Sequence, residues 1–286
     1  MPRLPLALAL AASSVALGAP ASPLHAPTAD ELAGAPWLGA DERVRSLADS
    51  FAPPPGFHRV DVAGGSFGAW LRRLPLRAPG SPVRAFDGSV VHAGDDARVA
   101  AVAELDVGTR DLQQCADSII RLDAEWRFAA NHRAQIAYPI GHGSRLAWTR
   151  WAAGERPRIS DHDRVTWRRG ARADDSHAAL RAFLDVVFGW AGTATLEDGT
   201  KRVPRAQLRA GDFFVLGGHP GHAVLVLDVV EDDAGHRRAL LGQGYMPAQD
   251  FHVLAHGGDP WFSLDGDTVD TPFWRPFPWT ALHRLP

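Results

Sequence analysis

Cys115 is the only cysteine in this 286-residue chain, so no internal disulfide can hold the fold together. The chain must instead be stabilised by an apolar core, and its 45% hydrophobic and 22% charged residues are sufficient to build one. A single cysteine of this kind is a buried inert residue, an intermolecular disulfide partner or a reactive thiol.

Residues 1–21 have the pattern of a secretory signal peptide. Arg3 supplies a positive charge, residues 4–17 form an uncharged apolar run, and Ala19 and Ala21 are small residues before a cleavage site at Ser22. A membrane anchor needs about 20 apolar residues, and this run is shorter. We therefore expect a periplasmic or secreted protein that has no integral membrane segment once the signal is removed.

The remainder of the chain divides into an arm and one domain. Residues 22–55 are rich in Ala, Pro and Gly and are predicted to be an N-terminal linker or arm, and residues 56–286 are predicted to form a single domain. The net charge of −3 and the pI near 6.5 give no reason to expect nucleic acid or an anionic membrane as a partner.

Two amphipathic helices are predicted. The first begins after Asp111 as N-cap, with Gln114 three residues later, and its apolar positions recur at helical spacing as far as Trp126. The second covers residues 176–190 and is opened by Ser176. Cys115 therefore lies near the start of the first helix, where the macrodipole and free N–H groups favour a thiolate.

Strands are expected mainly in the second half of the chain, and the tail from Pro260 is expected to wrap the surface. The turn at residues 232–235 predicts a hairpin between two of the strands. Because helices precede an antiparallel sheet, the pattern indicates an α+β fold. The predicted strands are residues 99–107, 135–140, 146–151, 212–216, 223–230, 238–241 and 251–254.

Three polar residues occur in the order that a cysteine hydrolase requires. Cys115 is the candidate nucleophile. His222 begins a strongly apolar strand and is the candidate general base. Gln243 ends the next strand, so the hairpin should return it to the same end of the sheet, where its amide oxygen can accept the His Nδ1–H and orient the ring.

Other residues compete with this set. His219 lies in the glycine-rich loop before His222 and is a less firmly positioned base. The histidines at 252 and 256 have the spacing of a helical zinc pair, but their segment is predicted to be extended and no glutamate is in register, so we expect neither a metal nor a cofactor. Tryptophans in loop-like segments offer rings for stacking on sugars, namely Trp148, Trp151, Trp261, Trp274 and Trp279.

Four segments, residues 65–76, 106–126, 211–229 and 243–254, resemble the bacterial domain-of-unknown-function family numbered 4846. Together they span most of the chain after residue 57. This resemblance identifies relatives but implies no activity.

A more distant resemblance is functional. A cysteine on a helix, then a "GD…GH" segment leading a strand, then an amide at the end of the next strand is similar to papain-like hydrolases, including NlpC-type peptidoglycan peptidases. The resemblance implies a helix packed on an antiparallel sheet, with residues 131–190 as a helical and loop-rich insertion. It also implies that Gln113 or Gln114 contributes near the oxyanion.

The sequence therefore favours an exported cysteine hydrolase that acts on an amide or ester bond in the cell envelope, with murein peptides as substrate. The alternative is a non-catalytic envelope module that holds a glycan or peptide with its aromatic loops. In either case the expected partner is peptidoglycan or a peptide, and not nucleic acid.

Overall fold

The computed structural model describes residues 22–141, 143–160 and 164–286. The predicted signal peptide, residues 1–21, lies outside these residues. Across the described ranges, no helix has both the length and the apolar character needed to cross a membrane.

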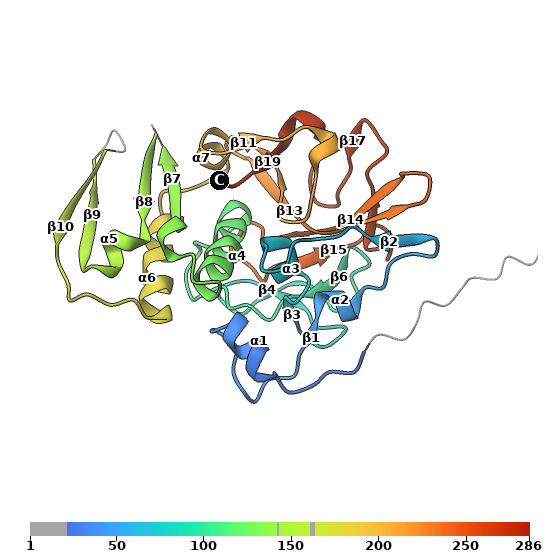
Figure 1. Cartoon of the computed structure of the whole chain (residues 1–286), viewed down its shortest axis with the longest axis horizontal. Helices are drawn as coiled ribbons and strands as arrows, with labels where there is room; N and C mark the ends of the chain where they lie inside the picture. The colour runs from blue at the N-terminus through green and yellow to red at the C-terminus, as the bar shows by residue number, and fades with distance from the viewer. Residues whose placement is uncertain (1–21, 142, 161–163) are drawn as a thin grey trace, which may run out of the picture.

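Within the described ranges, a nine-stranded antiparallel sheet forms the centre of the molecule (Figure 1). Seven strands follow one another in the order β11-β19-β12-β13-β14-β15-β6, while β2 pairs with β13 and β16 pairs with β14. The bounds are β11 Lys201–Arg202, β19 Leu282–Arg284, β12 Phe213–Leu216, β13 His222–Asp232, β14 Arg237–Gln243, β15 His252–Leu254, β6 Val99–Val102, β2 Phe57–Arg59 and β16 Trp261–Ser263.

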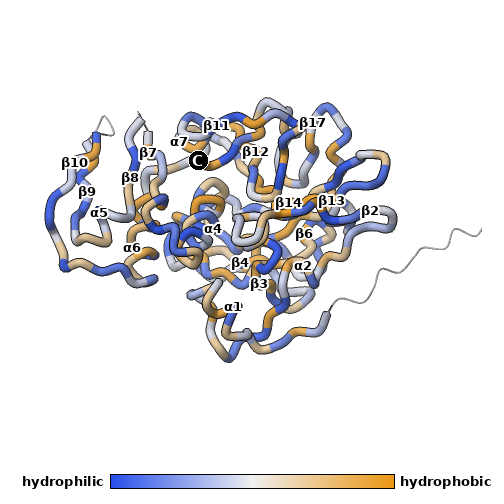
Figure 2. The backbone as a smooth tube through the Cα atoms, viewed as in Figure 1, coloured by the Kyte–Doolittle hydropathy of each residue, from blue (hydrophilic) through white to orange (hydrophobic). Residues whose placement is uncertain are grey.

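Strand β13 is apolar almost throughout because both of its faces are covered. Ala223 and Leu225 belong to the core on the helix side, while Val224 and Val226 belong to a second core on the far side. A strand buried on both faces needs a continuous apolar run rather than an alternating one. In Figure 2 hydrophobic colour accordingly runs through the central sheet, whereas the neighbouring helix α4 mixes hydrophobic and hydrophilic colours.

The hairpin between β13 and β14 is confirmed, and its turn is stabilised by Asp232. The Asp232 carboxylate accepts hydrogen bonds from the backbone N–H groups of Ala234 and His236, at 3.0 and 2.8 Å. This is the local side-chain bonding that makes aspartate a turn residue. The hairpin fixes the register in which Leu225 lies opposite Gly242, so the first residue of β13 and the last of β14 come to the same end of the sheet.

Helix α4 (Cys115–Ala129) is the central helix, and it lies between the sheet and the left-hand part of the molecule in Figure 1. It is buried on nearly every side. Two ion pairs within the helix satisfy four of its buried charges: Arg121 donates to Glu125 at 2.6 Å and Arg127 donates to Asp123 at 2.7 Å. Asp117 is buried as well, and desolvation raises its pKa well above the usual value.

The shorter elements surround this centre. The two-stranded sheets pair β1 (Arg45–Ser46) with β3 (Pro75–Leu76), β4 (Val83–Arg84) with β5 (Val90–His92), β7 (Ala137–Gly141) with β8 (Ser144–Ala147), β9 (Glu155–Ile159) with β10 (Val165–Arg169), and β17 (Thr268–Val269) with β18 (Phe277–Pro278). The other helices are α1 Ala29–Gly34, α2 Leu47–Ser50, α3 Phe67–Leu71, α5 Trp148–Ala152, α6 His177–Phe188 and α7 Thr193–Asp198, with 3₁₀ turns at Arg133–Gln135, Arg205–Gln207 and Trp279–Ala281.

Residues 22–55 contribute α1, β1 and α2 and are attached to the rest of the molecule. Trp37 Nε1–H donates to the Glu104 carbonyl at 2.6 Å, and Trp70 Nε1–H donates to the Gly34 carbonyl at 2.9 Å. Strand β1 pairs with β3.

The predicted α+β, papain-like fold of one helix on an antiparallel sheet is wrong. The described structure is mainly β, with several antiparallel sheets and few helices. The predicted helical and loop-rich insertion at residues 131–190 contains two hairpins, β7–β8 and β9–β10. Their strands are short and carry many arginines and small residues, so the alternation that marks a strand is weak there.

The predictions for residues 146–151 and for the tail were also wrong in part. Strand β8 ends at Ala147, and Trp148–Ala152 is the helix α5. The tail does not only wrap the surface, because Leu282 and His283 of β19 pair with β12 inside the central sheet. The helix at residues 176–190 is confirmed as α6, with the Ser176 hydroxyl accepting from the Ala179 N–H at 3.2 Å.

Candidate active site

Cys115 is the first residue of α4, because the helix begins later than the sequence predicted. The N-cap is Gln114, whose backbone N–H donates to the Asp117 carboxylate at 3.2 Å. Asp111 is not the cap, since its carboxylate accepts from the Gln114 side-chain amide and from the backbone N–H of Ala248, at 3.0 and 2.7 Å. The thiol therefore starts the helix, where N–H groups are free of intrahelical partners.

The thiol of Cys115 is protonated at neutral pH. Only 4% of the residue is exposed, and this burial, together with the nearby Asp117 carboxyl, raises the pKa of the thiol to about 11. Hydrogen bonds from the backbone N–H groups of Ala223 and Ala116 act in the opposite direction but do not outweigh desolvation. The thiolate that the helix N-terminus was expected to favour is thus not the resting form.

His222 and Gln243 are brought together as predicted. The His222 Nε2–H donates to Gln243 Oε1 at 2.7 Å, and both side chains are buried. The contact uses Nε2 and not the predicted Nδ1. It arises from the hairpin register, in which His222 begins β13 and Gln243 ends the adjacent strand.

A third side chain, His252, extends this pair across the sheet. In the register of β14 and β15, Gln243 lies opposite His252. The Gln243 Nε2–H donates to His252 Nε2 at 3.3 Å, and the His252 Nδ1–H donates to the Asp250 carbonyl at 3.0 Å. We call His222, Gln243 and His252 the histidine row.

The histidine row fixes the tautomer of His222. The Asp250 carbonyl can only accept, so His252 carries its proton on Nδ1 and presents a lone pair at Nε2. That lone pair takes the amide N–H of Gln243, which leaves the amide oxygen to accept from His222 Nε2–H. The remaining nitrogen, His222 Nδ1, therefore carries a lone pair. It is buried and has no hydrogen-bond partner among the described residues.

Both imidazoles of the row are neutral at pH 7. Burial lowers the pKa of His222 to about 4, against a smaller opposing effect of the hydrogen bond to Gln243. Burial lowers the pKa of His252 to about 4 as well, opposed by its hydrogen bond to the Asp250 carbonyl. A neutral His222 is the form that can accept a proton.

The thiol lies beside the start of β13. The backbone N–H that donates to it belongs to Ala223, the residue after His222. The Tyr245 ring lies 4.9 Å from the His222 ring between centroids, and burial, with a smaller contribution from Cys115, raises the pKa of Tyr245. Within the described part of the chain, however, no hydrogen bond joins the thiol to His222 Nδ1.

Two glycines hold the elements of this region close together. A Cβ on Gly244 would collide with the Ser118 hydroxyl and lie 3.0 Å from the Gln114 carbonyl, so the end of β14 touches the start of α4. A Cβ on Gly221 would lie 2.7 Å from the Leu216 carbonyl. Glycine is required at both positions because a side chain has no room.

A cavity of about 350 Å³ opens onto Cys115. The loop before β13 forms part of its wall, and so does the exposed His219, the competing base. Gln114 lines the cavity. Gln113, the other residue expected near the oxyanion, is instead buried and accepts a hydrogen bond from Arg121 at 3.0 Å.

The histidine row and α4 lie on opposite faces of the sheet. Side chains alternate along a strand, so His222 shares a face with Val224, whereas Ala223 faces α4. The rings of Trp274 and Phe277 cover His222 at centroid distances of 5.0 and 6.1 Å. The thiol and the imidazole therefore lie on opposite sides of the end of β13.

The sequence profile described as "Domain of unknown function (4846)" matches residues 47–284. The chain belongs to this family. The matched residues include Cys115 and the whole histidine row, whereas helix α1 lies before the first matched residue. Comparison with curated proteins gives no match, and neither does comparison with solved structures. The family description names no activity, so function must be argued from the side chains.

The sequence pattern did not indicate that His252 belongs to the histidine row. It indicated only the spacing of a zinc pair with His256. The available signal was the hairpin register, because the strand predicted at residues 251–254 follows β14 directly and its first polar residue pairs with Gln243. In the described ranges, no group of three or more His, Cys, Asp or Glu side chains is arranged to hold a metal ion.

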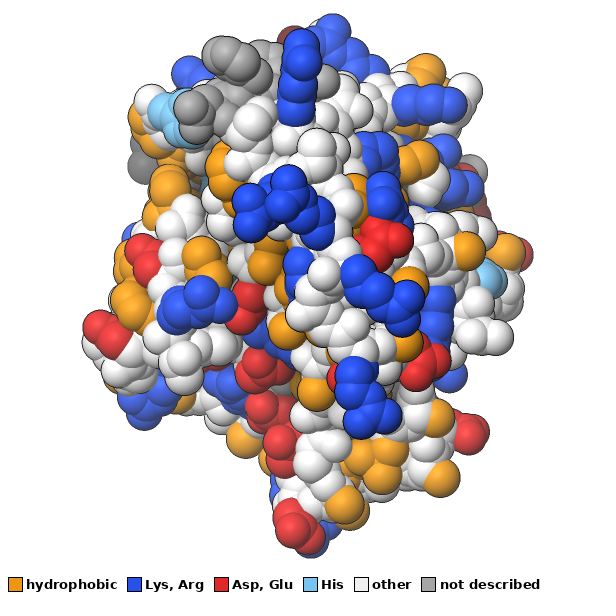
Figure 3. Space-filling view, turned by 90° about the vertical axis from the view of Figure 1, so that its left-hand side faces the viewer, with side chains coloured by type: hydrophobic (Ala, Val, Ile, Leu, Met, Phe, Trp, Pro, Cys, Tyr) orange, Lys and Arg blue, Asp and Glu red, His pale blue; other side chains and the backbone are white. Residues whose placement is uncertain are grey.

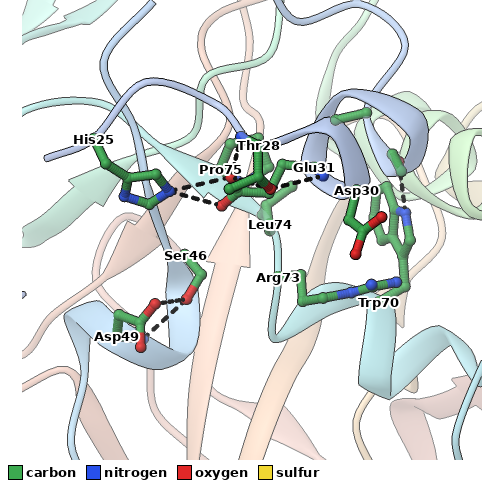
Figure 4. Close-up of a pocket in the computed structure, with 12 residues that line it drawn as sticks. His25, Thr28, Asp30, Glu31, Ser46, Asp49, Trp70, Arg73, Leu74 and Pro75 are labelled. Atoms are coloured by element: carbon green, nitrogen blue, oxygen red, sulfur yellow. Dashed lines mark hydrogen bonds and ion pairs between the residues drawn. The ribbon is translucent and has the colours of Figure 1, made fainter.

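A second cavity, of about 340 Å³, lies between the N-terminal arm and α3 (Figure 4). Its polar side chains bind one another: Glu31 accepts from Thr28 and His25, and Ser46 donates to Asp49 at 2.6 Å. The hydroxyls of Thr28 and Ser46 also cap α1 and α2, because they accept from the backbone N–H groups of Glu31 and Asp49 at 3.3 and 3.1 Å. This cavity therefore offers less chemistry than the one at Cys115.

Proposed function

We propose that this protein is a cysteine hydrolase that cleaves an amide or ester bond of the cell envelope, with murein peptides as the substrate class. The observation that carries the proposal is the lone pair on His222 Nδ1. This nitrogen is buried and has no partner in the described residues. The next residue along the chain, Ala223, donates its backbone N–H to the Cys115 thiol.

The proposed reaction starts from neutral partners. With the pKa of Cys115 near 11 and that of His222 near 4, the resting proton stays on sulfur. The proposal requires His222 Nδ1 and the thiol to come within hydrogen-bond reach around the end of β13 when a substrate carbonyl enters the cavity. The thiol proton then moves to His222 Nδ1 while sulfur bonds to the carbonyl carbon. His222 then returns that proton to the departing amine or alcohol, which leaves a thioester on Cys115. Water hydrolyses the thioester, again with His222 as the base.

Two further features support this assignment. The free N–H groups at the start of α4 are donors for the oxyanion that develops on the substrate carbonyl. Gln243 and His252 hold His222 in the tautomer whose lone pair is at Nδ1, which keeps the basic nitrogen away from the amide. A buried hydrogen-bond network whose linking groups all have partners is rigid, so it favours one position of the protons.

The alternative of an envelope-binding module rested on five tryptophan rings. Three of them, Trp148, Trp151 and Trp261, fill the core, with exposed fractions of 1%, 7% and 5%, and are not available to stack on a sugar. Trp274 and Trp279 are half-buried. Binding of murein fragments without turnover would favour this alternative over the hydrolase.

The experiment is an active-site titration of the protein without residues 1–21. An activated nitrophenyl ester should release a burst of nitrophenol close to one equivalent per chain, and murein peptide fragments should then be tested for turnover. His222→Ala should lower the rate by about 10²–10⁴-fold, as expected for loss of a general base. His219→Ala is the matched control, because His219 lines the same cavity but lies outside the row, and it should retain the burst.

Circular dichroism of each variant controls for folding. Cys115→Ser must abolish the burst if the thiol is the nucleophile. A burst that survives Cys115→Ser, an equal loss in both histidine variants, or binding of murein fragments by the intact protein without any turnover would each reject the hydrolase assignment.

A further inference from the structure

The hairpin β9–β10 has two chemically different faces. Its register places Trp167 opposite Pro157 and Val165 opposite Ile159 on one face, and Arg168 opposite Arg156 on the other. Trp167, Val165 and Ile159 pack against the main core. Because side chains alternate along a strand, Arg158 and Arg168 point away from the body of the molecule, whereas the Arg156 side chain folds back onto Trp151 of α5.

The outward side of the hairpin is strongly basic. Arg156, Arg158 and Arg168 form what we call the arginine face. Arg158 and Arg168 are exposed, while the Arg156 guanidinium stacks over the Trp151 ring at 3.9 Å from its centroid. Further exposed arginines surround this face, namely Arg150, Arg164, Arg169 and Arg172. Figure 3 shows blue side chains gathered on this side of the molecule.

Few carboxylates neutralise these charges. Arg150 forms an ion pair with Glu155. Over the described ranges, no ion pair to a carboxylate is formed by Arg156, Arg158 or Arg168, or by the exposed arginines at 164, 169 and 172. Residues 155–172 contain six arginines against three acidic residues, so this segment has a positive net charge in a chain whose net charge is −3.

The fold does not require this arrangement. Like charges directly opposite each other in an antiparallel pair are destabilising, and Arg156 and Arg168 occupy such positions. Arg156 helps to hold the hairpin, since it stacks on Trp151 and donates to the Trp151 carbonyl at 3.1 Å. Arg158 and Arg168 are exposed, so uncharged residues at these two positions would serve the packing equally well. The charges instead suit a ligand that carries several negative groups.

We propose that the arginine face docks the protein onto the anionic phospholipid surface of a membrane. The face belongs to a two-stranded sheet at the left-hand end of the molecule in Figure 1, where its exposed arginines are open to an approaching surface. Guanidinium groups bind phosphate oxygens in bidentate fashion. Juxtaposed basic side chains each add to attraction by an anionic leaflet.

A single-stranded nucleic acid fits this face less well. Such ligands are held by aromatic rings interleaved with basic residues, but Trp167 is on the inner face of the hairpin, below the Arg150 guanidinium at 5.0 Å from its ring centroid. The arginine face itself presents no aromatic side chain. The proposal is independent of the hydrolase assignment, because these residues do not line the cavity at Cys115.

The experiment is co-sedimentation of the protein with vesicles. Vesicles of phosphatidylcholine alone should bind the wild type at least tenfold more weakly than vesicles of equimolar phosphatidylcholine and phosphatidylglycerol. Binding to the anionic vesicles should disappear as salt rises from about 0.05 M to about 0.5 M, because the contacts are at the surface. The variant R158E/R168E should lose at least tenfold in binding to the anionic vesicles.

The matched control is R43E/R275E, which makes the same change in net charge at two exposed arginines outside the hairpin. It should bind anionic vesicles as the wild type does, and thermal unfolding should show that both variants are folded. Equal binding to neutral and anionic vesicles, an equal loss in the control variant, or tighter binding to single-stranded DNA than to the anionic vesicles would overturn the proposal. None of these outcomes bears on the nitrophenol burst.

Discussion

The histidine row and the arginine face are both built from polar side chains on neighbouring antiparallel strands, but they differ in every other respect. The row is buried and neutral, and hydrogen bonds satisfy its inner members. The arginine face is largely exposed and charged, and two of its guanidinium groups lie directly opposite each other.

The difference lies in how each group obtains a defined chemical state. In the row, burial removes water, so the protein's own acceptors decide where each proton lies. On the arginine face, water solvates each guanidinium, and the charge is the same whatever the neighbours are. The row is therefore expected to respond to mutation and to pH, and the face to respond to salt.

Breaking the row in its middle should have the largest effect. Gln243→Leu leaves the His222 Nε2–H and the His252 Nε2 lone pair buried without partners, at a cost of about 4 kcal/mol in the free energy of unfolding. Urea denaturation measures this loss. Arg158→Leu, which removes an exposed side chain, is the comparison and should change stability by less than about 0.5 kcal/mol. Similar losses in the two variants would contradict the distinction between row and face.

Acid should weaken the row by a smaller amount. The pKa values of His222 and His252 are near 4 in the folded state, below the usual value of 6.5, so the unfolded chain binds more protons between these limits. Stability should therefore fall as the pH falls, by about 1 kcal/mol per ring between about pH 7.5 and about pH 5.5.

Urea denaturation at the two pH values tests this, and His222→Gln should remove about half of the dependence. A stability that is constant across this range would mean that the two rings take up protons in the folded state, and the tautomer argument would then fail.

Relieving the arginine face should have the smallest effect, and of opposite sign. Arg168→Thr removes the like charge opposite Arg156 and should raise the free energy of unfolding by about 0.2–1 kcal/mol. The gain should shrink in high salt, which screens exposed charges. A loss of stability in urea denaturation would show that Arg168 contributes to the fold rather than to a surface.

Local features were predictable where a few neighbouring residues decide them. Asp232 specifies the turn between β13 and β14, and Ser176 caps α6. The turn brings His222 and Gln243 to the same end of the sheet, and the register shift between Val226 and Asp228 sets their final pairing. The start of α4 was misplaced because Asp111, a good cap by type, is used to bind Ala248, which is 137 residues away in the chain. Contacts of that range leave no periodic signal in the sequence.

The class of the fold was not predictable for a similar reason. Strand β19 enters the central sheet beside β12 although about 70 residues separate them, and its short sequence resembles a loop. Charge posed a different difficulty. The net value of −3 averages the hairpin arginines with acidic residues elsewhere, so composition pointed away from anionic surfaces while the register of β9 and β10 collects the arginines on one face.

The two crowded glycines have a consequence for motion. Gly244 puts the backbone of β14 against the start of α4, and Gly221 puts the start of β13 against Leu216. Backbone contacts of this kind cannot be relieved by changing a rotamer, so α4 and the central sheet should move as one rigid body. Any closing movement around a bound ligand is then left to the Gly217–Gly221 loop, where His219 is exposed at the rim.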